Sequence, residues 1–187
     1  MRLHGMRDSE LYGMPQAETQ PEAMPKEGIS VKIWSTPQPV FDKLNAEFNF
    51  DMDVCADPDN AKCPTWYSRT DGLSSYWGGT CFLNPPYGRN QIDPWLAKAL
   101  WIASIDWATV VCLVPSRTNS PWWHEYAMKA TEIRFVRKKL SFFGGKGVPF
   151  WGNAILVFRK GQVGQTPKVS SWIQPEKPNR KAVANAN

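Results

Sequence analysis

Residues 80–87 read TCFLNPPY, an apolar run that is followed at once by Asn84, two prolines and Tyr87. We expect residues 80–83 to form a short buried strand, because the run carries no turn residue. The prolines end that strand, since each restricts its own φ and lacks a backbone N–H. Ligands of open α/β sheets bind just beyond the carboxyl ends of the strands. Residues 84–87 therefore predict a binding site at that edge of a sheet.

The residues of this motif share a chemistry that suits a flat amine. Asn84 supplies a side-chain carbonyl oxygen, and the two prolines leave backbone carbonyl oxygens without N–H donors of their own. Two such acceptors can hold both protons of an exocyclic NH2 group while the Tyr87 ring stacks on its face. The structural alternative is an ordinary Pro-Pro turn capped by an asparagine.

The segments around the motif alternate between helix-like and strand-like patterns. We expect one helix to begin at residues 35–37, where Ser, Thr and Pro form a typical start, and two more over residues 92–104 and 120–130. We expect strands over residues 50–56, 80–83, 108–114, 132–136, 139–143 and 153–158. This succession predicts an α/β fold with a mostly parallel sheet and helices on both faces.

The composition is that of a globular protein with one domain. The chain has 187 residues, of which 42% are hydrophobic and 21% charged, and its net charge is +5. We expect a flexible leader over residues 1–29, a folded domain over 30–160 and a flexible basic tail over 161–187. No apolar run approaches the roughly 18 residues of a membrane span, and the first residues lack a signal-peptide core. We therefore expect a cytoplasmic protein.

The cysteines and the acidic residues argue against a disulfide scaffold and a metal site. No C-x-x-C pair occurs, so we expect reduced, mostly buried thiols at Cys55, Cys63, Cys81 and Cys112. The central Gly and terminal Glu of a calcium loop are missing around the acidic residues Asp51, Asp53, Asp57 and Asp59. The sequence therefore predicts no bound metal.

Beyond these patterns, the chain resembles the phage-type DNA adenine-N6 methyltransferases, which are small S-adenosylmethionine-dependent enzymes. Each matching piece alone is weak evidence, but the order and spacing of the pieces together are specific. The pieces are Trp34-Ser35-Thr36-Pro37, residues 50–63, Asp71-Gly72-Leu73, residues 84–87, residues 113–117, Trp122-Trp123-His124 and the closing strand. The resemblance implies the Rossmann-like sandwich of class I methyltransferases.

The resemblance also implies the reaction, which is transfer of a methyl group from S-adenosyl-L-methionine to the N6 amine of adenine in DNA. The catalytic residues that it implies are Asn84, Pro85, Pro86 and Tyr87. Hydrogen bonds from the amine to Asn84 and to the Pro85 carbonyl favour a pyramidal nitrogen with a free lone pair. Alignment of the amine with the methyl group is then worth up to ~7–11 kcal/mol in favourable cases.

For the cofactor, the resemblance implies an acidic residue at or just beyond the strand expected at 50–56. The usual Gly-x-Gly is missing there, and Asp57-Pro58-Asp59-Asn60 follows instead. Asp53 and Asp57 are both candidates for the carboxylate that accepts hydrogen bonds from the cofactor, and Asp53 is preferred. The alternative is that these carboxylates belong to a solvated strand end.

Two further pieces of the resemblance concern the cofactor. Asp71 corresponds to a residue that bonds the adenine amine of the cofactor, and Leu73 to an apolar residue that packs against that ring. An ordinary Asp-Gly turn is the alternative at this place. Thr36 and Pro37 correspond to a motif that closes over the methionine end, whereas Trp34 beside them is equally well explained as core.

Basic residues late in the chain are candidates for contacts with the DNA backbone. They bracket the aromatic pair at residues 142–143, although a run of charges usually just faces solvent. The DNA-binding candidates are Arg134, Arg137, Lys138, Lys139, Lys146 and Phe150, the last as a second stacking face. DNA is the expected partner, and no obligate protein partner is evident.

Other functions stay open at this point. Release-factor glutamine methyltransferases also use Asn-Pro-Pro-Tyr, but typically with a glycine-rich cofactor motif and a substrate domain, neither of which is evident here. Cytosine-N4 methyltransferases usually have a Ser at the position of Asn84. A catalytically silent DNA-binding relative is the alternative from another class, and the missing Gly-x-Gly is its best support.

Overall fold

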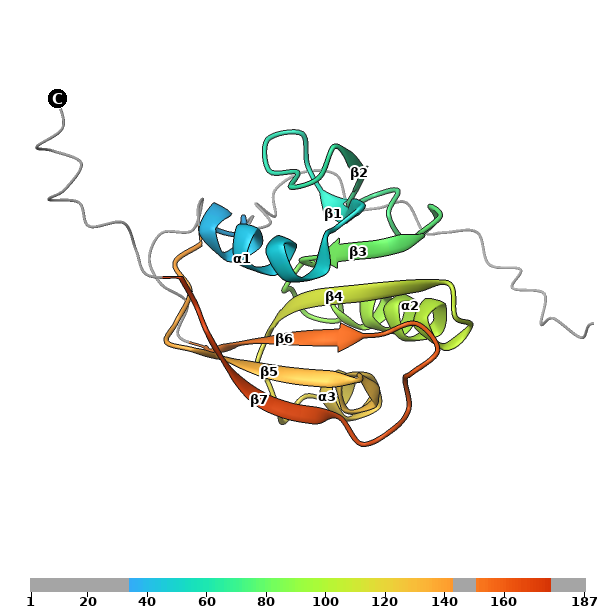
Figure 1. Cartoon of the computed structure of the whole chain (residues 1–187), viewed down its shortest axis with the longest axis vertical. Helices are drawn as coiled ribbons and strands as arrows, with labels where there is room; N and C mark the ends of the chain where they lie inside the picture. The colour runs from blue at the N-terminus through green and yellow to red at the C-terminus, as the bar shows by residue number, and fades with distance from the viewer. Residues whose placement is uncertain (1–33, 143–150, 176–187) are drawn as a thin grey trace, which may run out of the picture. The chain divides into compact units, whose positions relative to one another are not determined.

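The computed structural model describes residues 34–142 and 151–175, which contain a seven-stranded sheet with helices packed on it (Figure 1). The order of the strands across the sheet is β2-β1-β3-β4-β6-β5-β7. Their bounds are β1 Met52–Ala56, β2 Thr65–Ser68, β3 Gly79–Leu83, β4 Ala108–Pro115, β5 Glu132–Arg137, β6 Asn153–Phe158 and β7 Lys168–Ile173. The core is densest around β4 and β6, in which nearly every residue is buried.

The sheet is mixed, which corrects the expectation of a mostly parallel sheet. β1 pairs in parallel with β2 and β3, as β3 does with β4 and β5 with β7. β6, in contrast, runs antiparallel to both of its neighbours, β4 and β5. The sequence of β6, NAILVF, is apolar at almost every position and buried throughout. Such a run predicts a strand covered on both faces, but it carries no signal for the direction of that strand.

Helices cover both faces of the sheet, as expected. α1 (Gln38–Phe48) lies on one face, whereas α2 (Asp93–Ser104) and α3 (Pro121–Glu125) lie on the other (Figure 1). On β5, Arg134 reaches Glu47 of α1, while the next residue, Phe135, stacks on Trp123 of α3. Because successive residues of a strand point to opposite faces, these two contacts place α1 and α3 on opposite sides.

The segment that leads from α1 into β1 is shaped by two asparagines. Asn49 has a φ of 50° and ends α1 in the left-handed conformation, with its N–H donating to the carbonyl of Asn45. The side-chain oxygen of Asn45 then accepts the N–H of Phe50 at 2.8 Å. This is a common way to end a helix, since a left-handed residue satisfies carbonyls that the last turn leaves open. It delivers the chain to the start of β1.

The expected helices and most expected strands are confirmed, but several bounds differ. The helix expected over residues 120–130 is divided into α3 and a 3-10 turn at Ala127–Lys129. No strand forms over residues 139–142, the described part of the strand expected at 139–143. All four cysteines are free and buried, which confirms the expectation for the thiols.

The sequence does not predict β2 and β7, and β7 lies in the stretch that we assigned to a basic tail. Five of the six residues of β7 are exposed, and only Trp172 is buried. β7 therefore lacks the apolar pattern that signals a strand, and it is held by its parallel pairing with β5 at the edge of the sheet. The expected leader, residues 1–29, lies outside the described residues, as do residues 176–187.

Candidate active site

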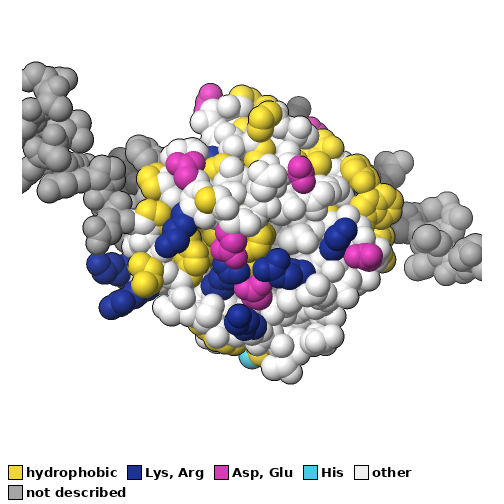
Figure 2. Space-filling model, viewed as in Figure 1, with side chains coloured by type: hydrophobic (Ala, Val, Ile, Leu, Met, Phe, Trp, Pro, Cys, Tyr) yellow, Lys and Arg dark blue, Asp and Glu magenta, His cyan; other side chains and the backbone are white. Residues whose placement is uncertain are grey.

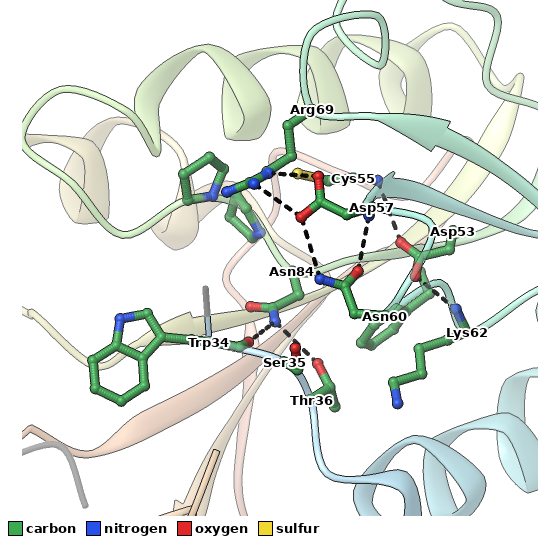
Figure 3. A pocket seen from close by; sticks show the side chains of 13 residues that line it. Trp34, Ser35, Thr36, Asp53, Cys55, Asp57, Asn60, Lys62, Arg69 and Asn84 are labelled. Atoms are coloured by element: carbon green, nitrogen blue, oxygen red, sulfur yellow. Dashed lines mark hydrogen bonds and ion pairs between the residues drawn. The ribbon is translucent and has the colours of Figure 1, made fainter. Parts of the chain in front are cut away.

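A polar cleft opens at the carboxyl ends of β1, β2 and β3, which are neighbours in the sheet and run in parallel (Figure 3). The segments that follow these strands and the segment before α1 supply most of its walls. Its empty volume, with open solvent at the mouth included, is about 450 Å³. It is lined by Trp34, Ser35, Thr36, Asp53, Cys55, Asp57, Asn60, Lys62, Arg69, Phe82, Asn84, Pro85 and Pro86.

Asn84 follows β3 directly, and every polar group of its side chain has a partner. Its Nδ2 donates to the backbone carbonyl of Trp34 at 2.7 Å and to Oγ1 of Thr36 at 3.0 Å. Its Oδ1 accepts a hydrogen bond from the Tyr87 hydroxyl at 2.7 Å. Thr36 is buried, and Asn84 itself is partly exposed at the cleft. The side chain is therefore held from behind while part of it stays accessible.

Tyr87 is buried, so its ring lies differently from the stacking face that we expected. Its exposed fraction is 7%, and the ring packs edge-on against Phe142 with centroids 6.2 Å apart. The hydroxyl lies 3.0 Å from the carbonyl oxygen of Leu113, in addition to its contact with Asn84. Burial raises the pKa of this hydroxyl well above its ordinary value. Tyr87 thus remains a neutral hydrogen-bond donor that supports Asn84 from within the core.

Asp53 is a buried carboxyl whose two oxygens bond to the backbone of its own loop. Oδ1 accepts the N–H of Cys55 at 3.3 Å, and Oδ2 accepts the N–H of Lys62 at 3.1 Å. Burial raises the pKa of Asp53 to about 6, although these hydrogen bonds and the Lys62 charge act in the opposite direction. Asp53 therefore closes the loop between β1 and β2 and forms part of the floor of the cleft.

Asp57 lies just beyond β1 and carries the more accessible carboxylate of the pair. Arg69, which follows β2, binds it at two points, with Nη2–Oδ2 at 2.8 Å and Nε–Oδ1 at 3.2 Å. Asn60 bonds back to Asp57 across the same turn, its Oδ1 accepting the Asp57 N–H at 2.9 Å. Figure 3 shows this group on one side of Asn84 and the Trp34 ring on the other.

Arg69 and Lys62 are cleft residues that sequence reasoning missed. Arg69 follows a four-residue strand, TWYS, in which no residue is fully buried, so β2 gave no pattern to mark a strand end there. Trp34, which we considered equally well explained as core, lines the cleft and is partly exposed. Its ring packs edge-on against Phe142 and Trp151, with centroids 5.7 and 5.8 Å apart.

Asp71 and Leu73 do not line the cleft. The Asp71 carboxylate accepts hydrogen bonds from the hydroxyls of Ser68 and Thr70 within an exposed turn. Leu73 instead lines a second groove with Tyr76, Trp77, Lys98, Trp101 and Trp107. Gly72 between them packs closely, since an added Cβ would lie 2.3 Å from the carbonyl oxygen of Val54 on β1. Pro37 caps α1 and is likewise absent from the lining of the cleft.

Among the basic candidates, Arg134 is occupied within the protein. Its guanidinium binds the carboxylate of Glu47 at two points, each at 2.7 Å, and that of Glu132 at 2.6 Å. These carboxylates raise the pKa of Arg134 further above its ordinary value. Arg134 thus fastens α1 to the sheet, and a phosphate would have to compete with both carboxylates. Oppositely charged side chains lie together over these elements in Figure 2.

The other basic candidates differ in position. Arg137, Lys138 and Lys139 are exposed and lie at or just beyond the carboxyl end of β5. Lys146 and Phe150 fall outside the described residues. Within residues 34–142 and 151–175, no group of three or more His, Cys, Asp or Glu side chains is placed to hold a metal ion. No helix of this part of the chain is long and apolar enough to cross a membrane.

An α/β sheet with an Asn-Pro-Pro-Tyr motif and an acidic turn at one edge is compatible with a methyltransferase fold, and comparison with known proteins agrees. The family described as DNA N-6-adenine-methyltransferase (Dam) matches residues 26–163. The chain belongs to this family, and it is a DNA adenine methyltransferase by this membership. It is also 38% identical over 63 residues to "Putative methyltransferase YfdM" of Escherichia coli (strain K12), a match that covers 29% of this chain and 69% of that protein.

Proposed function

We propose that this enzyme transfers a methyl group from S-adenosyl-L-methionine to the N6 amine of adenine at particular sites in DNA. The observation that carries the proposal is the Asn84 side chain, which lines the cleft at the edge of the sheet and is held there by Trp34 and Thr36 (Figure 3). Membership in the adenine-N6 family supports adenine as the base and DNA as the substrate.

On the base side, Asn84 and the Pro85 carbonyl accept the two protons of the adenine amine. The lone pair of that amine is delocalised into the ring, and these two hydrogen bonds favour the pyramidal nitrogen that can attack. The target base has to leave the duplex, which costs a few kcal/mol. Because Tyr87 is buried, we assign the stacking surface to the partly exposed ring of Trp34, which offsets part of that cost.

On the cofactor side, the groups of the cleft fit S-adenosyl-L-methionine chemically. Asp57 can accept hydrogen bonds from ribose hydroxyls, and its carboxylate is held in place by Arg69 and by Nδ2 of Asn60, which donates to Oδ2 at 3.4 Å. Lys62 also lines the cleft, and its ammonium, which donates to Oε1 of Gln38 at 2.9 Å, suits the carboxylate of the methionine moiety. When bound, S-adenosyl-L-methionine supplies the electrophilic methyl group. Asp57 is therefore our choice for the cofactor carboxylate, because its side chain is partly exposed at the cleft, whereas Asp53 is buried with both oxygens bonded to the backbone.

Contact with the DNA backbone is assigned to Arg137, Lys138 and Lys139. β5 runs antiparallel to β6, which runs antiparallel to β4, so the carboxyl ends of β5 and β4 lie at the same edge of the sheet. The exposed basic residues thus lie at the edge that carries Asn84. Each phosphate contact adds attraction that weakens with salt and carries no base specificity.

The test is transfer of labelled methyl from S-adenosyl-L-methionine to unmethylated DNA, followed by nucleoside analysis of the product. We expect N6-methyladenine, and sequencing of the methylated positions then gives the recognition site. Label on N4 of cytosine would overturn the assignment of the base. No transfer to any DNA, together with no cofactor binding in calorimetry, would favour a silent DNA-binding relative.

A further inference from the structure

The hydrogen-bonding capacity of Asn84 is almost fully used inside the protein. An asparagine side chain has two N–H donors and one carbonyl oxygen with two acceptor positions. Both donors are taken, by the Trp34 carbonyl and by Oγ1 of Thr36, and one acceptor position is taken by the Tyr87 hydroxyl. What remains for a substrate is one lone pair on Oδ1.

The partners also determine which way the amide of Asn84 points. The Trp34 backbone carbonyl can only accept a hydrogen bond, so it requires an N–H, 2.7 Å away, from the side chain. A flipped amide would set two carbonyl oxygens against each other at that distance. Thr36 is 3% exposed and Tyr87 7% exposed, so water does not compete well for the contacts that they make.

We propose that Thr36 and Tyr87, with the Trp34 backbone carbonyl, are positioning residues that orient the Asn84 amide so that a substrate meets only an acceptor. The inference rests on the proposed function and deepens it, because it explains how the site prefers a base amine to a base carbonyl. A carbonyl such as O6 of guanine or O4 of thymine would face the Asn84 oxygen without a proton between them. The role of Thr36 is thus directed at Asn84 rather than at the methionine end of the cofactor.

The first test removes the Thr36 hydroxyl and keeps the shape of the side chain. Thr36→Val leaves one N–H of Asn84 without a partner, and we expect kcat for adenine methylation to fall by about 10-fold, the effect of one hydrogen bond. KM for S-adenosyl-L-methionine and the binding of DNA should stay within about twofold. Thr36→Ser restores the hydroxyl and should recover most of the lost kcat.

A matched control loses a threonine hydroxyl elsewhere. Thr131 accepts the N–H of Arg159 at 3.1 Å and donates to the carbonyl of Gln162 at 3.2 Å, away from the cleft. Thr131→Val should lower the thermal unfolding midpoint about as much as Thr36→Val does, without lowering kcat. A fall in kcat that follows stability in both variants would overturn the inference.

A double-mutant cycle then separates positioning from cofactor contact. In an Asn84→Ala background, Thr36→Val should cause no further loss in residual transfer or in cofactor affinity measured by calorimetry, because its effect passes through Asn84. A weakened cofactor affinity in both backgrounds would overturn the inference while leaving the proposed function intact. If the wild-type enzyme forms no N6-methyladenine, both proposals fail.

The second test needs no change at Thr36 and serves if that variant does not fold. Asn84→Asp sets a carboxylate oxygen against the Trp34 carbonyl, where Asn84 has an N–H. We expect kcat to fall by about 10- to 100-fold at pH 8 and the ratio of variant to wild-type kcat to rise as the pH is lowered, because a protonated carboxyl again donates. A ratio that stays near one, or does not change between pH 5.5 and 8, would contradict the orientation that we infer.

Discussion

The two ends of the sheet present very different surfaces. At the carboxyl ends of β1 to β3, the cleft is lined by polar groups that the backbone holds in place, as Asn84 and Asp53 illustrate. At the amino ends of β3 and β4 lies the second groove, here called the aromatic groove (Leu73, Tyr76, Trp77, Lys98, Trp101 and Trp107). Tyr76, Trp101 and Trp107 are each at least half exposed there.

The difference between the two ends concerns what remains open for a ligand. In the cleft, the Asn84 oxygen keeps one free acceptor position, and Asp57 and Lys62 carry charges at the wall. In the aromatic groove, the ammonium of Lys98 is used by the carbonyls of Gly72, Leu73 and Ser75. We therefore propose that the chemistry takes place at the carboxyl ends, as the topology of α/β sheets predicts, and that the aromatic groove contributes packing.

The largest effect is expected from Asn84→Ala in the cleft. The variant loses the acceptor for the substrate amine, so kcat should fall by at least about 100- to 1000-fold, the range seen when one preorganised polar group is removed from an active site. Steady-state kinetics with adenine-containing DNA and calorimetry with S-adenosyl-L-methionine check this. Cofactor affinity should change little and the variant should still fold, with a lower unfolding midpoint because the buried groups of Thr36 and Tyr87 lose a partner. A fully active variant would place the chemistry elsewhere.

The cleft shows which parts of a site can be read from sequence. Asn84 was predictable because a strand, a proline pair and an aromatic residue are adjacent in the chain, and adjacency survives folding. Arg69 was not, because its partner Asp57 lies twelve residues away and comes within reach through the pairing of β2 with β1. We expected the Tyr87 ring to stack on the substrate. In the structure its hydroxyl lies 3.0 Å from the carbonyl oxygen of Leu113, a residue of β4 that is 26 positions further along the chain, so the ring is in the core.

The fold likewise has parts that the sequence predicts and parts that it does not. Helices with a proline in the first turn and strands with buried apolar runs were predictable, since local pattern decides both. β6 is antiparallel to β5, and β7 is held by its pairing with β5. Neither feature was predictable, because backbone hydrogen bonds between strands do not require particular side chains. We expected Leu73 at the cofactor from its position in the sequence alone. In the structure it lies between β2 and β3 and lines the aromatic groove instead.

The next effect concerns stability and comes from Asp53. Because burial raises its pKa from 3.8 to about 6, the folded state holds the proton more tightly than the unfolded chain does. The contribution of this group is most favourable below about pH 4 and is lost as the pH rises to about 6, by about 3 kcal/mol in total. Asp53→Asn removes the titration, so urea unfolding at several pH values should show wild type losing stability relative to the variant over this window. If the stability of wild type and of the variant changed with pH in the same way, the raised pKa of Asp53 would be contradicted.

A substitution at Lys98 tests whether the aromatic groove contributes to stability and not to catalysis. Its ammonium bonds three carbonyls at 2.5 to 3.0 Å and lies 4.5 Å from the centroid of the Trp77 ring. Lys98→Met keeps the apolar stem and should lower the free energy of unfolding by about 1–3 kcal/mol, because three carbonyls lose a charged donor. Lys129→Met, at an exposed lysine of the 3-10 turn, is the control. At a temperature where Lys98→Met is folded, its kcat should equal that of wild type.

The smallest effect is expected from Trp101→Gln in the aromatic groove, and it bears most directly on the difference between the two ends. Trp101 is 57% exposed on α2, so the free energy of unfolding should change by no more than about 0.5 kcal/mol. Because α2 leads from the carboxyl end of β3 back to the amino end of β4, Trp101 lies at the end of the sheet away from Asn84. Both kcat and KM for DNA should therefore match wild type. A raised KM for DNA with an unchanged unfolding midpoint would mean that the exposed rings of the aromatic groove touch the substrate, and DNA would then have to reach both ends of the sheet.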